Sequence, residues 1–265
     1  MLRLWLTRRW LVGTLIAIVF GMACFALGRW QWGRYVDKQT KATAIATNYD
    51  AAPVPLTPTL LDRGLTPERQ WTRVTTTGTY AAHADLLVRN RTLDTVPGFE
   101  VLTPFTMDAG TILVDRGWVP NAETAAAAPP VDPPPTGPVQ VTGWLRTGEP
   151  SLGRELPSGQ LASINIADAR AQRPAVGASD VYLVLGSQTP PTTDSGHRVA
   201  PLPRPTQDLG PHQAYAIQWW ITMPAGLVFV VWAMRRELLA RTEEGEAAPV
   251  AVKPKKVRIW DEEDY

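Results

Sequence analysis

The sequence predicts an α+β membrane protein, in which a two-helix transmembrane hairpin carries a mostly antiparallel β domain inserted between its two spans. Three observations predict this fold class. Two apolar runs without a charged residue lie near opposite ends of the 265-residue chain. Short β-branched runs, separated by glycine and proline, fill the segment between them. Arginines outside both apolar runs indicate that the two chain ends share one side of the membrane.

The two apolar runs are predicted transmembrane helices at residues 10–28 and 213–234. Both are close to the roughly 20 residues that a spanning helix needs. A cleaved signal peptide is the alternative for the first run, but a signal peptide has a shorter apolar core of about 7–15 residues. The second run contains Pro224, which a membrane helix tolerates when a neighbour or a local distortion satisfies the freed carbonyl.

Small residues recur every four positions along the first span, at Gly13, Ala17 and Gly21. This spacing places them on one helix face, where another helix can approach closely. The neighbour is either the second span or a helix of a partner subunit. The alternative is the ordinary small-residue content of a membrane span.

The arginine distribution predicts the orientation. Arginines lie outside both spans at Arg3, Arg8, Arg9, Arg235, Arg236 and Arg241. By the positive-inside rule, residues 1–9 and 235–265 are cytoplasmic and the domain at 29–212 lies on the outer side. Further cations follow the first span at Arg29, Arg34, Lys38 and Lys41, but long domains translocate largely regardless of charge. The 235–265 tail has too little apolar content to fold alone and is predicted to be disordered.

The intervening domain is predicted from short runs rich in β-branched residues. The expected strands are residues 71–80, 85–92, 99–106, 111–119, 139–147 and 181–187. A helix is expected at 166–172, and residues 29–49 are expected to continue the first helix beyond the membrane. The Pro/Ala-rich segment 122–138 is predicted to be an extended, exposed loop.

Composition and motifs argue against several classes of function. The net charge of +1 gives no basic footprint for nucleic acid. The single cysteine, Cys24, excludes an intramolecular disulfide and a CxxC redox motif. The chain has no GxSxG, HExxH, P-loop or Rossmann motif. Ser195 and His197 are close in sequence, but residues two apart in a loop rarely form a catalytic pair, and the sequence does not predict an enzyme.

The start of the second span carries the most informative polar residues. On a helix, His212, Tyr215 and Trp219 share one face, and Gln218 lies about one and a half turns in. Polar side chains inside a span usually face protein or a cofactor rather than lipid. A neutral imidazole is also a common axial ligand of haem iron. The alternative is that His212 only ends the helix at the membrane interface.

Basic and aromatic residues follow the first span at the same predicted boundary. Trp30 and Trp32 suit the headgroup layer, where an indole ring is half hydrated. Arg29 and Arg34 can grip carboxylates in a two-pronged way, so haem propionates, protein carboxylates and lipid phosphates all remain candidate partners.

Four sequence blocks resemble the Surfeit locus protein 1 family, which assembles haem–copper cytochrome c oxidase. LGRWQWGR at 27–34 resembles its LGxWQxxR signature, GFEVLTPF at 98–105 its central strand block, and ILVDRGWVP at 112–120 its VNRGWVP block. HQAYAIQWW at 212–220 resembles its HxxYAxQW block. Order and spacing agree from Leu27 to Met234. Asp115 is a departure, since asparagine is frequent there.

The resemblance implies a membrane accessory factor that inserts or stabilises haem a in the catalytic subunit of the oxidase. It implies His212 as a ligand of the haem iron. Ring contacts would come from Trp219 or Trp220, and Arg29 or Arg34 would lie near the propionates. The surface for oxidase subunits, or for a larger respiratory supercomplex, would comprise Trp30, Gln31, Tyr215, Gln218, Gly13, Ala17 and Gly21. The alternative is a structural accessory subunit clamped to the oxidase without binding haem.

Two further features bear on these expectations. An abundance of arginine, alanine and proline is typical of a high-GC bacterial genome, so the expected location is a bacterial cell membrane, with lipid as a further partner. Arg116, Trp118 and Pro120 are either a functional edge or the tight end of a strand. The sequence favours the structural interpretation, because the glycine between Arg116 and Trp118 allows a bend and the tryptophan can join the core.

Overall fold

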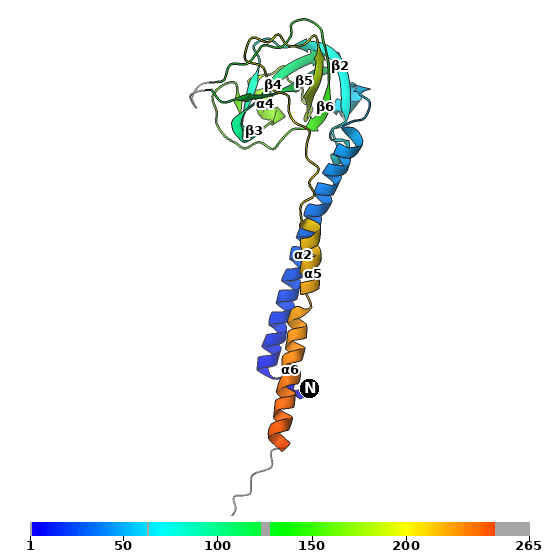
Figure 1. Ribbon diagram of the computed structural model, residues 1–265, viewed down its shortest axis with the longest axis vertical. Helices are drawn as coiled ribbons and strands as arrows, with labels where there is room; N and C mark the ends of the chain where they lie inside the picture. Colours follow the sequence, from blue (N-terminus) through cyan, green and yellow to red (C-terminus); the bar gives the residue numbers. More distant parts are fainter. Residues whose placement is uncertain (1, 63, 123–127, 247–265) are drawn as a thin grey trace, which may run out of the picture. The chain divides into compact units, whose positions relative to one another are not determined.

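The computed structural model describes residues 2–62, 64–122 and 128–246, and the chain divides into two compact units (Figure 1). The helical unit comprises Met1–Tyr35 and Gly210–Tyr265, and the sheet unit comprises Val36–Leu209. The sheet unit is therefore shorter at both ends than the domain expected at 29–212.

The helical unit contains two helical segments that are long and apolar enough to cross a membrane. Helix α1 (Leu2–Trp5) precedes helix α2 (Arg8–Asn48), which continues beyond the first apolar run as expected. The second apolar run forms α5 (His212–Thr222) and α6 (Ala225–Glu246). The two helices are separated at Met223 and Pro224, because proline lacks the N–H that would continue the hydrogen-bond ladder.

Helix α6 corrects the prediction for the C-terminal tail. Residues 235–246 were expected to be disordered, but α6 continues through them to Glu246. Arg241 donates to Glu237 one turn earlier, and this i,i+4 pair supports a helix whose sequence is otherwise polar. Residues 247–265 lie outside the described part of the chain.

The predicted small-residue face of α2 packs against the second apolar segment of the same chain. A Cβ atom added at Gly21 would lie 3.4 Å from the carbonyl oxygen of Met223, and one added at Gly226 would lie 3.2 Å from Cβ of Ala17. Cys24 and Gly28 are also buried on this face, at the heptad-like spacing that keeps two helices in contact. Gly13 has open space around it.

The sheet unit contains eight strands in the order β1-β2-β6-β8-β5-β4-β3-β7, with an additional β2–β4 pairing that closes five of them into a ring (Figure 1). The strands are β1 (Val54–Pro55), β2 (Arg73–Tyr80), β3 (Leu86–Leu93), β4 (Val96–Met107), β5 (Gly110–Pro120), β6 (Val139–Thr147), β7 (Gln160–Leu161) and β8 (Val181–Thr189). All six predicted strands are confirmed. Three short helices complete the unit: α3 (Pro58–Asp62), η1 (Pro67–Arg69) and α4 (Ile166–Gln172).

The sheet is mixed, with five antiparallel and three parallel strand pairings, so the expectation of a mostly antiparallel domain holds in part. Consecutive strands β3, β4 and β5 pair antiparallel, as their short connections require. Strand β8, however, lies between β5 and β6, parallel to the first and antiparallel to the second. Since β5 and β6 run in opposite directions, any strand inserted between them must be parallel to one of them.

Two large apolar clusters form most of the core of the sheet unit, and a smaller third one includes Phe99 and Val101. Of the two large clusters, the first includes Val74, Phe105 and Leu183, and the second includes Leu86 and Leu102. Helix α4 covers the second cluster through Ile166 and Ala169. Its N-cap residue Asn165 accepts a hydrogen bond from the backbone N–H of Asp168, which satisfies one orphan donor of the first turn. The predicted helix at 166–172 is thereby confirmed.

The Pro/Ala-rich segment is only partly as predicted. It has no regular secondary structure where it is described, but Pro129, Asp132 and Pro134 are buried rather than exposed. The reason is the polar anchoring of Asp132, described below. Residues 123–127 of this segment lie outside the described part of the chain.

Candidate functional site

The first candidate site lies in the helical unit, where α5 begins beside α2. His212 Nδ1 lies 2.9 Å from Oε1 of Gln31, and both side chains are half-buried. With the Gln31 oxygen as acceptor, Nδ1 is the donor and carries the proton. The lone pair is then on Nε2, which is the tautomer that a metal ligand requires.

A second contact joins α5 to α2 at Gly28, one helical turn before Gln31. The indole of Trp220 lies directly over Gly28, where an added Cβ would be only 2.3 Å from Trp220 Nε1. Trp32 lies against the same indole, with ring centroids 5.7 Å apart. Trp220 Nε1 is buried and, within the described residues, has no hydrogen-bond partner. An unpaired buried donor is costly, and this cost accompanies the close packing of the indole on Gly28.

The remaining predicted residues of this region point away from the contact between the helices. The exposed side chains are Arg29, Trp30, Arg34, Tyr215 and Gln218, whereas Trp219 is half-buried. The guanidinium of Arg34 lies 5.9 Å from the ring centroid of Trp30. Tyr215 therefore does not share the packed face with His212; fully buried Ala216 takes that place. The structure brings His212 to Gln31 and Trp220 to Gly28 and Trp32, and it leaves the two arginines exposed.

This arrangement can supply one axial ligand rather than a closed metal site. Within residues 2–62, 64–122 and 128–246, no three histidine, cysteine, aspartate or glutamate side chains gather in a way that could hold a metal ion. A single imidazole oriented by a glutamine, beside indole rings and accessible guanidinium groups, fits a flat apolar ring system that bears an iron and peripheral carboxylates. The residues therefore fit a haem held at one face.

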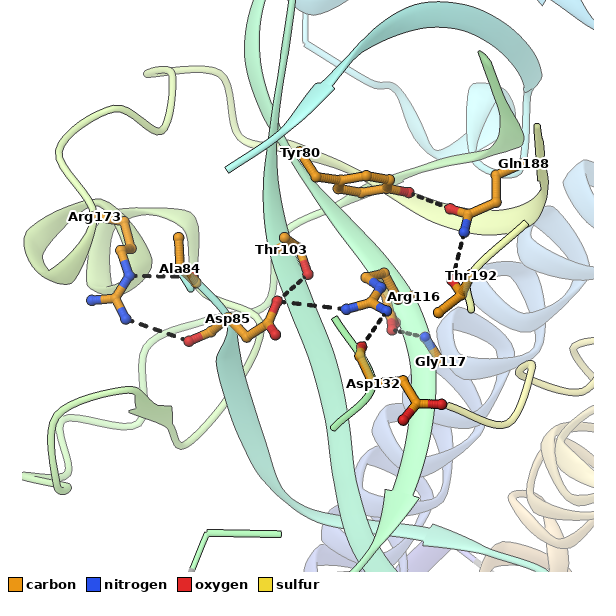
Figure 2. A network of polar contacts seen from close by, with 11 residues as sticks. Tyr80, Ala84, Asp85, Thr103, Arg116, Gly117, Asp132, Arg173, Gln188 and Thr192 are labelled. Atoms are coloured by element: carbon orange, nitrogen blue, oxygen red, sulfur yellow. Dashed lines mark hydrogen bonds and ion pairs between the residues drawn. The ribbon is translucent and has the colours of Figure 1, made fainter. Parts of the chain in front are cut away.

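A buried polar network surrounds Arg116 in the sheet unit, and Figure 2 shows its members. Arg116 Nη2 donates to the carbonyl oxygen of Asp132 at 2.7 Å, and Nη1 lies 3.7 Å from Asp85 Oδ1. The hydroxyl of Thr103 donates to the same carboxylate oxygen of Asp85. Burial lowers the pKa of Arg116, and the Asp85 carboxylate opposes that shift. Arg116 of β5 thus ties the loop at Asp132 to Asp85, just before β3, and Asp85 in turn accepts from Thr103 of β4.

The Asp132 carboxylate holds a second loop in place. It accepts hydrogen bonds from the backbone N–H groups of Ser195 and His197, at 3.2 and 3.1 Å, and from the Ser195 hydroxyl. The hydrogen bond from the Ser195 hydroxyl is the main cause that lowers the pKa of Asp132. The Ser195 hydroxyl therefore donates to Asp132 rather than to His197, and Asp132 anchors the loop that contains both residues.

The Asp-Arg-Gly-Trp sequence lies within strand β5 rather than in a turn. Gly117 has φ +126°, and an added Cβ would lie 2.1 Å from the carbonyl oxygen of Ala200. The register between β4 and β5 shifts at this point, which is typical of a β-bulge. The glycine therefore permits both the bulge and the close approach of the 200 region. The structural interpretation of Arg116 and Trp118 agrees with these contacts.

Sequence reasoning did not find Gly28 or Asp115 as individual site residues. Gly28 lies inside the 27–34 block, and its importance follows only from the indole that covers it. Asp115 is fully buried at 1 % exposure, among Glu100, Arg91 and Glu149. An acidic residue in an apolar strand run was the available signal, since such residues are almost never buried without a specific reason.

Together, the fold and this site define a class of protein: a pair of apolar helices with an oriented histidine at one end, attached to a mixed-sheet unit without a recognised catalytic motif. The chain belongs to the SURF1 family, whose model matches residues 18–223 and so includes all four sequence blocks. SURF1-like proteins of Mycobacterium bovis (strain ATCC BAA-935 / AF2122/97) and Mycobacterium tuberculosis (strain ATCC 25618 / H37Rv) are each 35% identical over 257 residues, 92% of this chain and 90% of theirs. The family is in general one of cytochrome oxidase assembly factors rather than enzymes.

Proposed function

We propose that this protein helps to assemble haem–copper cytochrome c oxidase in the bacterial cell membrane and carries haem a transiently at the His212 end of its helix pair. Membership of the SURF1 family supports the role in oxidase assembly. The hydrogen bond between His212 and Gln31 is the observation that carries the haem proposal. In the proposed orientation both chain ends are cytoplasmic and the sheet unit lies on the outer side, in keeping with the arginine distribution.

Each residue of the site has a separate role in this proposal. His212 would bind the haem iron through Nε2, while Gln31 holds the imidazole in the correct tautomer. Trp32 and Trp220 would contact the apolar ring, and Arg29 and Arg34 would pair with the propionates. Haem a is cargo here, and the chemistry it supplies is used in the oxidase. A single axial ligand suits a carrier, because release must remain easy.

A structural accessory subunit is the second candidate, and one observation favours it. An apolar groove of about 470 Å³ lies along the helical unit, lined by Gly13, Ile16, Phe20 and Gly226 among others. The open space at Gly13 would accept a helix of an oxidase subunit. Ala17 and Gly21, in contrast, are already covered by the second apolar segment. In this case His212 would only orient the start of α5.

Haem binding by purified full-length protein separates the two candidates. The protein would be co-expressed with the oxidase, purified in mild detergent, and titrated with haem a while the Soret band is recorded. His212→Ala is expected to lower haem affinity at least about 10-fold, and Gln31→Leu by about 10–100-fold, as for other residues that orient a metal ligand. His83→Ala is the matched control, because His83 lies in the sheet unit and should leave the titration unchanged.

Two outcomes would overturn the haem proposal. One is the absence of a Soret shift for the unaltered protein. The other is equal affinity of the unaltered protein and His212→Ala. Co-purification of oxidase subunits with both the unaltered protein and His212→Ala would then support the structural candidate. Failure of both haem binding and co-purification would argue against the role in oxidase assembly itself.

A further inference from the structure

A cavity of about 310 Å³ lies within the sheet unit, away from the polar network around Arg116. Its floor is one face of the sheet, across the neighbouring strands β3, β4, β5, β8 and β6. The floor side chains are Arg91, Glu100, Asp115, Tyr182, Trp144 and Arg146. Tyr49, just after α2, and the segment Leu202–Pro205 line it from two distant parts of the chain.

Aromatic stacking gives this cavity a preformed wall. The Tyr49 ring stacks on Trp144 with centroids 4.2 Å apart and an interplanar angle of 10°. Trp144 Nε1 also donates to the carbonyl oxygen of Tyr49 at 2.8 Å. On Tyr49 itself lies the guanidinium of Arg204, 4.7 Å from the ring centroid, and Arg204 forms a two-pronged ion pair with Asp50. Rings fixed in this way need no reordering when a ligand enters.

The positive groups of the cavity are already engaged with partners other than Asp115. Arg91 pairs with Glu100 through Nε at 2.9 Å and with Glu149 through Nη2 at 2.6 Å. Arg146 lies over the Trp71 ring, 4.3 Å from its centroid, and its Nε donates to the side-chain oxygen of Gln70. The cavity thus contains two guanidinium groups and three carboxyl groups. Of the two arginines, Arg91 forms ion pairs with two of these carboxyl groups, and within the described residues Arg146 forms none with them.

Asp115 is the acid of the cavity that forms no ion pair, although the charge of Arg91 acts on it. Its Oδ1 accepts one hydrogen bond, from the backbone N–H of Gly117 at 3.1 Å. In the part of the chain that the structure describes, it forms no ion pair. Burial, with the nearby Glu100 carboxylate, raises the pKa of Asp115 well above its usual range. Burial of this kind favours the neutral carboxyl, whereas a positive charge placed beside it favours the carboxylate.

We propose that this cavity binds a small organic cation, an ammonium or quaternary ammonium group, with Asp115 and Glu100 as counter-charges and the aromatic wall as its contact surface. Aromatic faces attract such cations through their quadrupole, most strongly in desolvated sites. Since Trp144 and Arg204 cover the Tyr49 ring, this attraction would come from Trp118 and Tyr182, which also line the cavity. The cavity volume is in the range of small-molecule sites. A metal ion is the less suitable occupant, because the described residues contain no metal-holding cluster of three or more ligands. On binding, the Asp115 carboxyl releases its proton to solvent and the ligand supplies the replacing charge.

Calorimetric titration of the full-length protein in detergent micelles tests this inference. The probes are choline and n-butylammonium, and 3,3-dimethylbutan-1-ol is the uncharged control with the shape of choline. Both cations are expected to bind at least about 10-fold more tightly than the alcohol. The measured enthalpy should change with the ionisation enthalpy of the buffer, since a proton is released. A preference for butylammonium would indicate a lysine side chain of a protein, and a preference for choline a free quaternary amine.

Two variants make the test specific to Asp115. Asp115→Asn keeps the shape of the buried carboxyl and the acceptor for Gly117, and should lower cation affinity at least about 10-fold. Asp108→Asn changes an exposed acid of the same unit and should leave affinity unchanged. A circular dichroism spectrum confirms that each variant is folded, and Glu100→Gln, which removes the other proposed counter-charge, replaces Asp115→Asn if that variant is not. Equal binding of the alcohol and the cations, no binding of either, or unchanged affinity in the Asp115 variant would overturn the inference.

Discussion

Replacement of Arg116 by methionine tests whether the buried network of the sheet unit stabilises the fold. Methionine retains most of the volume of the side chain and removes its charge and donors. The change deletes a charged hydrogen bond to the Asp132 carbonyl and the ion pair to Asp85. Removing one partner of a buried pair costs about 3–5 kcal/mol, because the other group is left uncompensated. Since Asp85 retains 25% side-chain exposure and the pair is 3.7 Å long, the lower end, about 3 kcal/mol, is expected.

The matched control is Arg204→Met in the same unit. Arg204 has the shorter ion pair, 2.8 Å to Asp50, but the two side chains are 49% and 67% exposed. An exposed pair contributes about 1 kcal/mol or less, and the contact with the Tyr49 ring adds about 0.5–1 kcal/mol. Burial rather than distance is therefore expected to decide which arginine matters more for stability.

The assay is denaturant unfolding of the full-length protein in detergent micelles, followed by tryptophan fluorescence. Asp85→Asn and the double variant complete a mutant cycle, which isolates the contribution of the pair. If Arg116→Met lowers the free energy of unfolding by less than Arg204→Met does, the argument from burial is wrong. A coupling energy near zero in the cycle would show that Arg116 acts through the Asp132 carbonyl alone.

Two other predictions concern packing and pH. Gly28→Ala should destabilise the helical unit by about 1–3 kcal/mol, because the added methyl group overpacks against Trp220. Thermal unfolding followed by circular dichroism at 222 nm measures this change. Gly33→Ala is the control, since its Cβ meets nothing within 4 Å and should cost no stability, and equal effects of the two substitutions would contradict the contact between Gly28 and Trp220. Because burial raises the pKa of Asp115 in the folded protein, its contribution to stability is present below the unfolded-state pKa and is lost as the pH rises through the folded-state pKa. Asp115→Asn should therefore reduce the fall in melting temperature as the pH rises above about 4, the ordinary pKa of an aspartate, and an unchanged slope would place the titration elsewhere.

Local patterns in the sequence determined much of this molecule. Apolar length predicted the two helical segments, β-branched runs predicted six strands, and the Ile166–Gln172 helix was found from its composition. Each of these depends on residues adjacent in the chain, whose periodicity is fixed by helix or strand geometry. The four sequence blocks that indicated the family are likewise short and continuous, and the family assignment is confirmed.

Only the tertiary structure decided which of these elements meet. Strand β8 lies between β5 and β6, parallel to one and antiparallel to the other, and no property of the β8 sequence alone sets these neighbours. His212 and Gln31 are 181 residues apart, and their hydrogen bond exists because two apolar helices pack through small residues. The exposure predicted for the Pro/Ala-rich loop was wrong because Asp132 finds its donors in a loop 63 residues away. The cavity around Asp115 depends in the same way on aromatic and charged side chains from several distant segments, since packing and charge compensation act through space rather than along the chain.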